Sequence, residues 1–182
     1  MNFKFTTNQF AGVVVIEPRV FKDERGYFYE TYKYSDFKAG GISDNFVQDN
    51  QSYSTRGVVR GLHFQVAPRA QAKLVRCVSG EIYDCIVDLR KSSPTFGKYF
   101  GVNLSAENKL MLYVPIGFAH GFSTLSQTAE VSYKVSDEYD PKSEFGLKCD
   151  DPEIRIDWKV SNPIVSQKDQ ILPALKDLKT LF

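Results

Sequence analysis

The segment Lys73-Leu-Val-Arg-Cys-Val-Ser-Gly-Glu-Ile-Tyr-Asp-Cys-Ile-Val-Asp-Leu89 decides the fold class of this chain. Its second half, 82–89, has apolar side chains at every second position, a period that suits a strand and that a helix cannot use. Asp84 and Asp88 alternate with apolar side chains, so the second half of the segment is a strand with two distinct faces. Ser79-Gly80 divides the segment and is typical of a tight hairpin turn.

Similar short runs recur outside this segment, whereas helical patterns are weak and peripheral. Together with 73–78 and 81–89, strands are predicted at 13–16, 99–104, 111–114 and 130–135. Helical spacing is limited to 36–39, 106–110 and the tail 173–181, where Leu175, Leu178 and Leu181 lie three apart. Many short strands with few helices predict an all-β antiparallel sandwich or barrel, such as a jelly roll with a few short peripheral helices.

Length and charge narrow the classes of protein to consider. The chain has 182 residues with no repeat or linker, so we expect a single domain over 1–182, with a jelly-roll core at about 45–140 between N-terminal strands and a C-terminal helical tail. Its 23 basic and 22 acidic residues create no overall field that would attract nucleic acid or a membrane surface. Cys77, Cys85 and Cys149 lack metal-ligand spacing, which favours core thiols and a cytoplasmic location.

The chain contains two histidines, and each lies in a motif with glycine. His63 lies in Arg60-Gly-Leu-His-Phe-Gln65, and His120 lies in Pro115-Ile-Gly-Phe-Ala-His-Gly-Phe122. A lone histidine of this kind is more often a buried ring satisfied by one hydrogen bond than a functional group. Two such motifs in one chain weaken that interpretation.

The pattern Pro115-x-Gly117-x-x-His120 resembles the second motif of the cupins, small jelly-roll barrels that often hold a metal with three histidines and a glutamate. In the first cupin motif a second histidine and a glutamate complete the set, but here those positions carry Gln65 and Lys73. An ammonium among the ligands would repel a cation. We therefore predict a barrel without a metal ion.

Alternation along the strands places two further polar groups inside the barrel. Lys73 shares a face with Val75 and Cys77, and Tyr133 shares one with its apolar neighbours at 131 and 135. Taken singly, a lysine is usually a solvated surface residue and an inward tyrosine is usually core packing. With His63, however, they form a set of base, oxyanion stabiliser and acid that suits proton abstraction next to a carbonyl. Asp169 offers a carboxylate partner for the base, although its segment could equally be a helix cap before 171–175.

Seven motifs in order resemble the dTDP-4-dehydrorhamnose 3,5-epimerase family from about residue 10 to residue 173. They are Phe21-x-Asp-Glu-Arg-Gly-Tyr-Phe28, Phe46-Val-Gln-Asp-Asn50, Arg60-Gly-Leu-His-Phe-Gln65, Lys73-Leu-Val-Arg76, Ser93-Pro-Thr-Phe-Gly97, Gly117-Phe-Ala-His-Gly-Phe122 and Ser166-x-Lys-Asp169. The resemblance implies a cupin-type fold and an isomerase of nucleotide-sugar synthesis for surface polysaccharide. It implies no cofactor.

The same resemblance implies a role for each site residue. His63 would be the general base, oriented by Asp169, and Tyr133 would be the general acid on the opposite face of the sugar. Lys73 would stabilise the enolate oxygen, and His120 would line the pocket. Contacts to the dTDP-sugar would come from Arg25, Glu30, Gln48, Asn50, Arg60, Glu144 and Lys168, with Tyr139 stacked on the thymine. Family members are homodimers whose N-terminal strands cross between subunits, so Arg25 and Glu30 would serve the neighbouring site.

Three alternatives stay open at this point. The nearest is a relative that inverts carbon 3 alone or acts on another 4-keto nucleotide sugar, because it would keep the same pocket residues. A metal-dependent cupin and a non-catalytic sugar-binding jelly roll are the others. The chain also departs from the family pattern at Lys159, where proline is usual, and at Cys149, where an aromatic is common.

Overall fold

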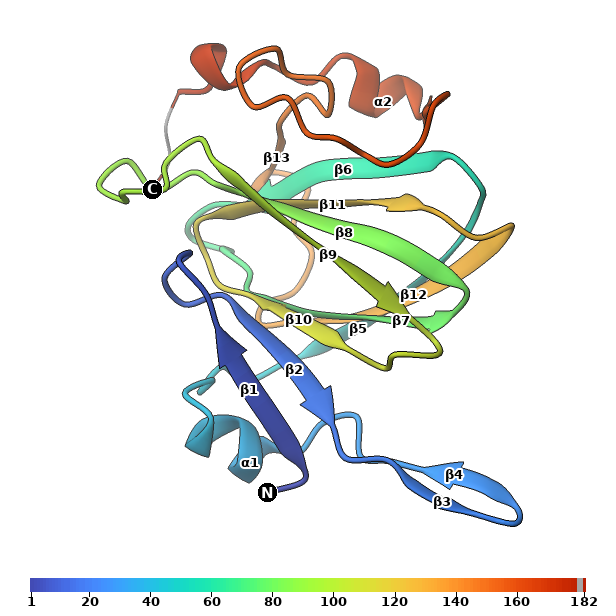
Figure 1. The fold of residues 1–182 in the computed structure, drawn as a ribbon. Coiled ribbons are helices and arrows are strands. Elements are labelled where there is room, and N and C mark those ends of the chain that lie inside the picture. The colour runs from blue at the N-terminus through green and yellow to red at the C-terminus, as the bar shows by residue number, and fades with distance from the viewer. Residues whose placement is uncertain (180–181) are drawn as a thin grey trace.

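Two antiparallel sheets that face each other form the body of the molecule (Figure 1), in a computed structural model that describes residues 1–179 and 182. The first sheet has the order β1-β2-β10-β7-β12-β5, and the second has the order β13-β6-β11-β8-β9 with β14 parallel to β6. The strands of the first sheet are β1 (Phe3–Thr7), β2 (Val14–Pro18), β10 (Met111–Val114), β7 (Lys73–Ser79), β12 (Thr128–Val135) and β5 (Gln48–Thr55). Those of the second are β13 (Glu144–Gly146), β6 (Val58–Gln65), β11 (Phe118–Thr124), β8 (Glu81–Asp88), β9 (Tyr99–Ser105) and β14 (Ile164–Val165). This arrangement confirms the all-β jelly-roll prediction.

A separate two-stranded hairpin, β3 (Phe21–Asp23) and β4 (Gly26–Phe28), projects away from the two main sheets (Figure 1). Its aromatic side chains are exposed, with Tyr27 at 59% and Phe28 at 66% of their full accessible area. Apolar rings left in water at a projecting hairpin are typical of a surface that meets another molecule.

The chain between β7 and β8 corrects the hairpin predicted at Ser79-Gly80. β7 pairs with β10 and β12 in the first sheet, while β8 pairs with β11 and β9 in the second. Gly80 has φ +75°, and a Cβ there would lie 2.1 Å from the Thr128 carbonyl oxygen. The glycine therefore forms a corner that carries the chain from one sheet to the other, and the two strands are not hydrogen-bonded neighbours.

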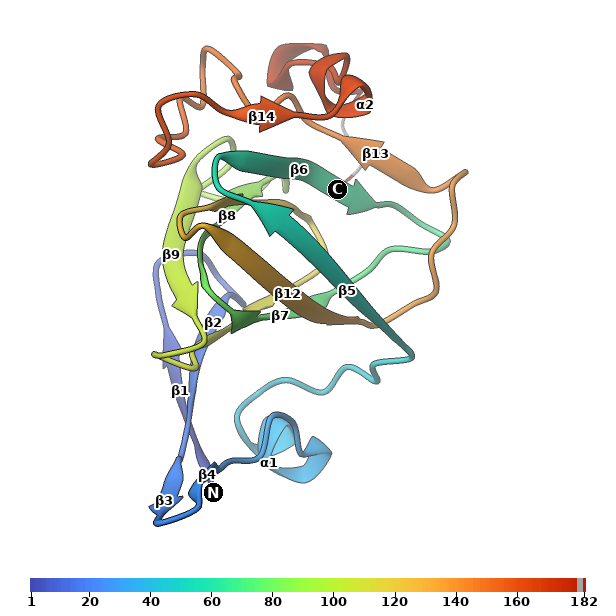
Figure 2. The same cartoon turned by 90° about the vertical axis from the view of Figure 1, so that its right-hand side faces the viewer.

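Three apolar clusters account for the alternation in the sequence. The central one, between the sheets, takes Val75 and Cys77 from β7 and Ile82 and Ile86 from β8. The opposite face of β8 packs, through Cys85 and its neighbours, under the C-terminal segment, which lies over β6 in Figure 2. A third cluster lies between the first sheet and helix α1 (Tyr34–Ala39). All three cysteines are buried and free, as predicted.

The short helices follow the sequence only in part. The helix predicted at 36–39 is confirmed as α1. The helix predicted at 106–110 is wrong, because the Asn108 side chain accepts hydrogen bonds from the backbone N–H groups of Ser105 and Leu110 and holds a turn. In the tail, helical structure is limited to α2 (Gln167–Gln170) and the 3₁₀ turn η1 (Leu175–Asp177), and Leu181 lies outside the described residues.

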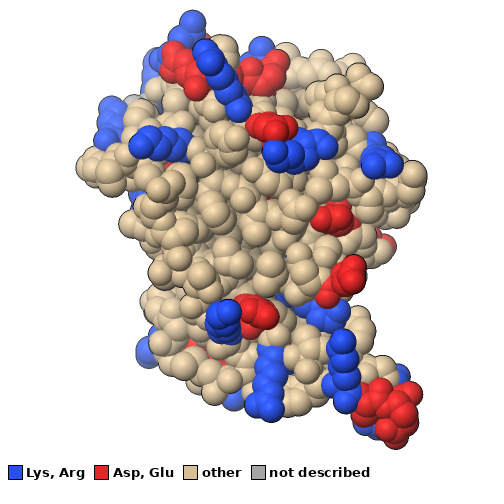
Figure 3. All heavy atoms as spheres, viewed as in Figure 1, with Lys and Arg blue, Asp and Glu red and all other residues tan. Residues whose placement is uncertain are grey.

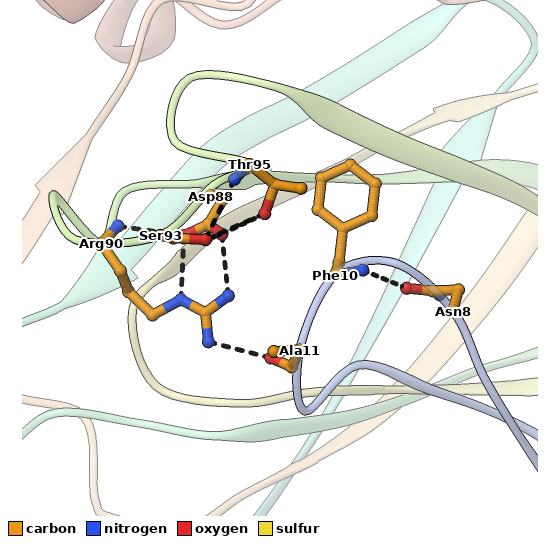
Figure 4. Close-up of polar contacts among 7 residues, drawn as sticks. All are labelled: Asn8, Phe10, Ala11, Asp88, Arg90, Ser93 and Thr95. Atoms are coloured by element: carbon orange, nitrogen blue, oxygen red, sulfur yellow. Dashed lines mark hydrogen bonds and ion pairs between the residues drawn. The ribbon is translucent and has the colours of Figure 1, made fainter.

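A buried polar cluster holds the loop after β8 (Figure 4). The Asp88 carboxylate accepts hydrogen bonds from the Arg90 side chain at 2.7 and 2.9 Å and from the hydroxyls of Ser93 and Thr95 at 2.6 Å. Arg90 also donates to the Ala11 carbonyl at 2.9 Å, so the cluster ties this loop to the chain that leads into β2. The Ser93-Pro-Thr-Phe-Gly97 motif is thus structural in this fold.

The surface carries both signs of charge without a large area of either one on the face shown in Figure 3. Within the described residues, no helix is long and apolar enough to cross a membrane.

Candidate active site

A cavity of about 530 Å³ opens between the two sheets, with an adjoining hollow of about 140 Å³. Side chains from both sheets line the cavity, and His63, Lys73 and Tyr133 border both spaces. Of the other residues predicted for the site, the larger space receives Arg60, His120, Lys168 and Asp169. The smaller one receives Gln48, Asn50, Tyr139 and Glu144.

His63 and Asp169 form a dyad at the wall of this cavity. The imidazole Nε2 lies 2.7 Å from Asp169 Oδ1, and the Gly61 N–H donates to Oδ2 at 3.3 Å. Burial alone would raise the pKa of Asp169, but the hydrogen bond and charge of His63 bring it below its ordinary value. An ionised carboxylate at Nε2 selects the tautomer with the proton on Nε2, so Nδ1 is left with a lone pair that can accept a proton.

The dyad joins segments more than 100 residues apart, and local features bring them together. Ile164 and Val165 of β14 pair with Val58 and Val59 of β6, which places the following helix beside His63. Ser166 caps α2 by accepting the Asp169 N–H at 3.1 Å. The segment therefore does cap a helix, but that helix is 167–170 and not the predicted 171–175, and the capped turn presents the carboxylate partner of His63.

A glycine lets β6 and β11 approach closely enough to face the cavity together. His63 and His120 are direct partners in the register of these strands. Gly61 has φ +116°, and a Cβ there would lie 2.7 Å from the Gly121 Cα and 2.8 Å from the His120 carbonyl oxygen. A larger residue at 61 would push the two strands apart and displace both imidazoles.

Lys73 lies inside the barrel, as alternation predicted, with 9% of its area exposed. Its Nζ donates to the His63 carbonyl at 3.3 Å. Burial lowers the pKa of Lys73 to about 8, against the opposing charges of Asp84 and Glu144. The side chain is thus a partly desolvated ammonium at neutral pH, a strong electrostatic group for a developing oxyanion.

Tyr133, on β12 of the first sheet, faces the cavity from the side opposite His63, and its ring packs against the central cluster. Burial raises the pKa of Tyr133, and the nearby Arg60 guanidinium acts in the opposite direction. The phenol therefore holds its proton at neutral pH and can donate it. A proton donor on the first sheet and a proton acceptor on the second sheet flank the same space.

The outer end of the site is polar and more exposed. Glu144 Oε2 accepts from the Lys168 ammonium at 2.7 Å and from the Tyr139 hydroxyl at 2.9 Å. The Tyr139 ring is 54% exposed, and its backbone N–H donates to Gln48 at 2.9 Å. The Gln48 amide in turn donates to Asn50 at 2.8 Å. These contacts build a mouth with amide, carboxylate, ammonium and aromatic groups.

A family model described as dTDP-4-dehydrorhamnose 3,5-epimerase matches residues 7–177 of the chain, which carry this site. The chain belongs to that epimerase family. The curated dTDP-4-dehydrorhamnose 3,5-epimerase of Shigella flexneri is 56% identical over 158 residues, which cover 86% of this chain and 87% of that protein. The match confirms the family that the sequence motifs predicted.

Solved structures of epimerases share the fold over nearly the whole chain. The crystal structure of dTDP-4-dehydrorhamnose 3,5-epimerase from Elizabethkingia anophelis NUHP1 is 50% identical, with a TM-score of 0.93 over 99% of this chain and 100% of that one. The dTDP-6-deoxy-D-glucose-3,5-epimerase of Legionella pneumophila Philadelphia 1, in complex with dTDP-4-keto-L-rhamnose, is 43% identical. Its TM-score is 0.93, over 97% of this chain and 95% of that one.

Two residues that the epimerase motifs place at the substrate lie away from the cavity in this chain. Arg25 is on the projecting hairpin, where its guanidinium pairs with Asp23. Glu30 accepts a hydrogen bond from the Asn2 amide at 2.9 Å. Neither residue lines the cavity or the adjoining hollow.

The donor set of a cupin metal centre is incomplete in this epimerase. Gln65 is turned to the loops after β6 and β12, where its amide donates to the backbone carbonyls of Arg69 and Glu138. Lys73 brings a positive charge to the position of the anionic ligand. Among the described residues, no group of three His, Cys, Asp or Glu side chains is placed to hold a metal ion. The residues present do not suit a metal cofactor.

Sequence reasoning missed two residues at the epimerase site, Ser52 in the cavity lining and Asp84 behind His120. Asp84 is fully buried on β8, with Oδ1 2.8 Å from His120 Nε2. Ser52 lies on β5 and lines the cavity, and its hydroxyl has no hydrogen-bond partner in the described part of the chain. The signal for Asp84 was its alternation with apolar residues on a strand that is buried on both faces. For Ser52 the sequence offered no signal, because its strand contains almost no apolar residues.

Proposed function

We propose that this member of the epimerase family inverts carbons 3 and 5 of dTDP-4-dehydro-6-deoxy-glucose to give dTDP-4-dehydrorhamnose. The observation that carries the proposal is the placement of the His63–Asp169 dyad, the Lys73 ammonium and the Tyr133 phenol around one cavity. Inversion needs a base on one face of the ring and an acid on the other, and the two sheets supply them from opposite sides. The cavity draws on residues from β5 to α2, so we propose that residues 1–182 act as one epimerase domain.

The reaction is two rounds of proton transfer next to the 4-keto group. His63 Nδ1 takes the proton from carbon 3 or 5, the C–H electron pair forms a double bond to carbon 4, and the carbonyl pair moves to oxygen 4. Tyr133 then donates a proton to the opposite face of the same carbon, and the enolate returns to the ketone. The proton on His63 and the charge on Tyr133 are exchanged with water. A positioned acid or base of this kind contributes about 10² to 10⁴ in rate.

Lys73 stabilises the negative charge that develops on oxygen 4. Its low exposure makes that charge–charge interaction stronger than it would be in water. The imidazolium that forms on His63 is stabilised in turn by the Asp169 carboxylate at 2.7 Å. The two charges that develop when the proton is abstracted thus each meet a fixed opposite charge.

The polar mouth of the cavity suits the nucleotide. Lys168 and Arg60 offer charge-assisted donors to the diphosphate, and the exposed Tyr139 ring offers a stacking face to the thymine. Gln48 and Asn50 supply amide groups that can pair with the edge of the base. Glu144 accepts hydrogen bonds from both Lys168 and Tyr139 and so holds those two side chains in place.

We also propose that two copies form a homodimer in which the β3–β4 hairpin crosses to the neighbouring site. The exposed aromatic rings of the hairpin and the position of Arg25 outside its own cavity support this arrangement. In the partner's site, Arg25 and Glu30 would contact the substrate. The three buried free cysteines support the cytoplasm as the location of the enzyme.

The test is incubation of the enzyme with dTDP-4-dehydro-6-deoxy-glucose in heavy water, with the product read by proton NMR. Double epimerisation predicts deuterium at carbon 3 and carbon 5 of a product with the rhamno configuration. Deuterium at carbon 3 alone would show a 3-epimerase, and no incorporation would defeat the proposal in favour of a sugar-binding protein. Loss of turnover with a chelator, restored by a metal, would show a metal-dependent cupin instead.

A further inference from the structure

Strand β8 places two aspartates on the interior face of the barrel, and their surroundings differ sharply. Asp84 and Asp88 are both 0% exposed. Asp88 is surrounded by the donors of Arg90, Ser93 and Thr95. Asp84 meets His120 through Oδ1, but its Oδ2 has no hydrogen-bond partner among the residues that the structure describes. A buried carboxylate oxygen without a donor costs stability, so packing does not explain Asp84.

Asp84 lies next to the reactive end of the cavity. It is opposite Phe122 in the register of β8 and β11, one step along the interior face from His120. Two negative charges, Asp84 and Glu144, raise the pKa of Lys73 against the effect of burial, and Asp84 has the larger effect. Asp84 also raises the pKa of Cys77, which shares the interior face of β7 with Lys73. Asp84 therefore faces β7 across the barrel and lies beside His120 on the neighbouring strand.

We propose that Asp84 is a positioning residue for the reaction: its buried carboxylate orients His120 and supplies the counter-charge that keeps the Lys73 ammonium protonated inside the barrel. The inference deepens the proposed function and rests on it for its catalytic consequence. Because Asp84 holds His120 Nε2, Nδ1 is the imidazole nitrogen left for the substrate. Lys73 and His120 would then share the stabilisation of oxygen 4 under the control of one carboxylate.

The other acidic groups around the cavity are already engaged. Asp169 is bonded to His63 and to the Gly61 N–H, and Glu144 is bonded to Lys168 and Tyr139. Asp84 differs in having a whole oxygen free of protein donors in the described chain. The titratable and charged groups that face Lys73 from the strands and the helix around it are Arg60 and His63 on β6, Asp84 on β8, His120 on β11, Tyr133 on β12, Glu144 on β13, and Lys168 and Asp169 on α2.

The decisive variant is Asp84→Asn, which removes the charge and keeps the shape. The first measurement is the pH dependence of amine labelling at Lys73 in the free protein, read by mass spectrometry after reaction with acetic anhydride. We expect the labelling midpoint to move to lower pH by roughly one unit or more, because an opposite charge close to an ionisable group shifts its pKa by that amount. The second measurement is kcat/KM for the dTDP-4-keto sugar against pH, whose alkaline limb should move down with the midpoint. For a shift of one unit from about 8, the variant loses about fivefold more activity at pH 8 than at pH 6.

Two further variants separate this role from a structural one. Glu81→Gln makes the same charge change on the same strand but outside the cavity, so the Lys73 midpoint and the alkaline limb should stay at the wild-type values. His120→Gln should lower kcat while leaving the Lys73 midpoint in place, because Asp84 remains. If Asp84→Asn does not fold, Asp84→Ser removes the same charge with a smaller side chain for the same titration.

The outcomes distinguish the inference from the function on which it rests. Midpoints that coincide in Asp84→Asn and the wild type, or an equal shift in Glu81→Gln, overturn the inference even if the enzyme is an active epimerase. A wild-type protein without turnover overturns the proposed function, and the labelling of Lys73 then still decides whether Asp84 holds its charge.

Discussion

The Asp88 cluster offers a sharp quantitative test of how this fold is stabilised. Burial alone would raise the pKa of Asp88, but the hydrogen bonds from Arg90, Ser93 and Thr95 bring it down to about 2. An unfolded chain would give this carboxyl its ordinary pKa of about 3.9. The ionised carboxylate therefore contributes about 2.5 kcal/mol to the free energy of unfolding at neutral pH. Because the folded-state pKa is depressed, this contribution is complete above about pH 4 and is lost as the pH falls through about 2.

Asp88→Asn removes the charge and leaves the Arg90 guanidinium with an amide in place of a carboxylate. We expect a loss of about 3 kcal/mol or more at pH 6, of which about 2.5 kcal/mol depends on pH. The assay is urea unfolding of wild type and variant at pH 6 and pH 3. At pH 3 the pH-dependent part of the difference should fall by about half, because the wild type is losing the same interaction. Asp157→Asn, which alters an exposed carboxylate paired with Lys159, should change the free energy of unfolding and its pH dependence far less than Asp88→Asn does.

If Asp88→Asn lowers the free energy of unfolding by the same amount at pH 6 and at pH 3, this reasoning is refuted. Such a result would show that the cluster does not stabilise the charge of Asp88. Epimerase activity of the folded variant should match the wild type at 25 °C, because Asp88 does not line the cavity. A fall in kcat without a fall in stability would likewise contradict a purely structural role.

Three further results are expected from the site. The alkaline limb of wild-type kcat/KM should have an apparent pKa of about 8, because Lys73 loses its proton there. Lys73→Arg should move this limb beyond pH 10, and Lys73→Met should lower kcat at every pH. His63→Ala should abolish deuterium incorporation at both carbons, whereas Tyr133→Phe should lower epimerisation by about 10² to 10⁴ while exchange by the intact base continues. Arg25→Ala and His63→Ala should each be inactive alone, and mixing the two variants should restore part of the activity, because a mixed dimer contains one complete site. If mixed dimers form and the mixture stays inactive, the crossing hairpin is contradicted.

The sequence predicted several strands whose interior faces are apolar and missed β5, whose interior face is polar. The strands predicted at 111–114 and 130–135 correspond closely to β10 and β12. In β5 the residues that point inward are Gln48, Asn50, Ser52 and Ser54, so no apolar alternation marks the strand. Gln48, Asn50 and Ser52 line the polar cavity and its adjoining hollow rather than a core. The polarity that suits these side chains to a ligand also hides the strand from a search for hydrophobic periodicity.

The hairpin prediction at Gly80 failed for a related reason. A local turn signal shows that the chain reverses, but it does not show whether the next strand pairs with the previous one. In this fold the pairing is set by contacts of high sequence separation, such as Val131 with Cys77 and Phe122 with Asp84. The proximity of Asp169 to His63 is of the same kind, and the motifs of the family predicted it where spacing could not.

The position of Lys73 along β7 shows how the fold sets the strength of its charge. The same interior face continues from Lys73 to Val75 and Cys77, so the ammonium lies at the boundary between the wet cavity and the apolar core. If the lysine were two residues further along the strand, in the place of Val75, burial would remove its charge at neutral pH. On the outer face of the strand, water would screen the charge. At the boundary the pKa of about 8 leaves about nine tenths of the lysine charged at pH 7. The barrel thus places its cation where desolvation strengthens the interaction with an enolate oxygen but does not yet neutralise the amine.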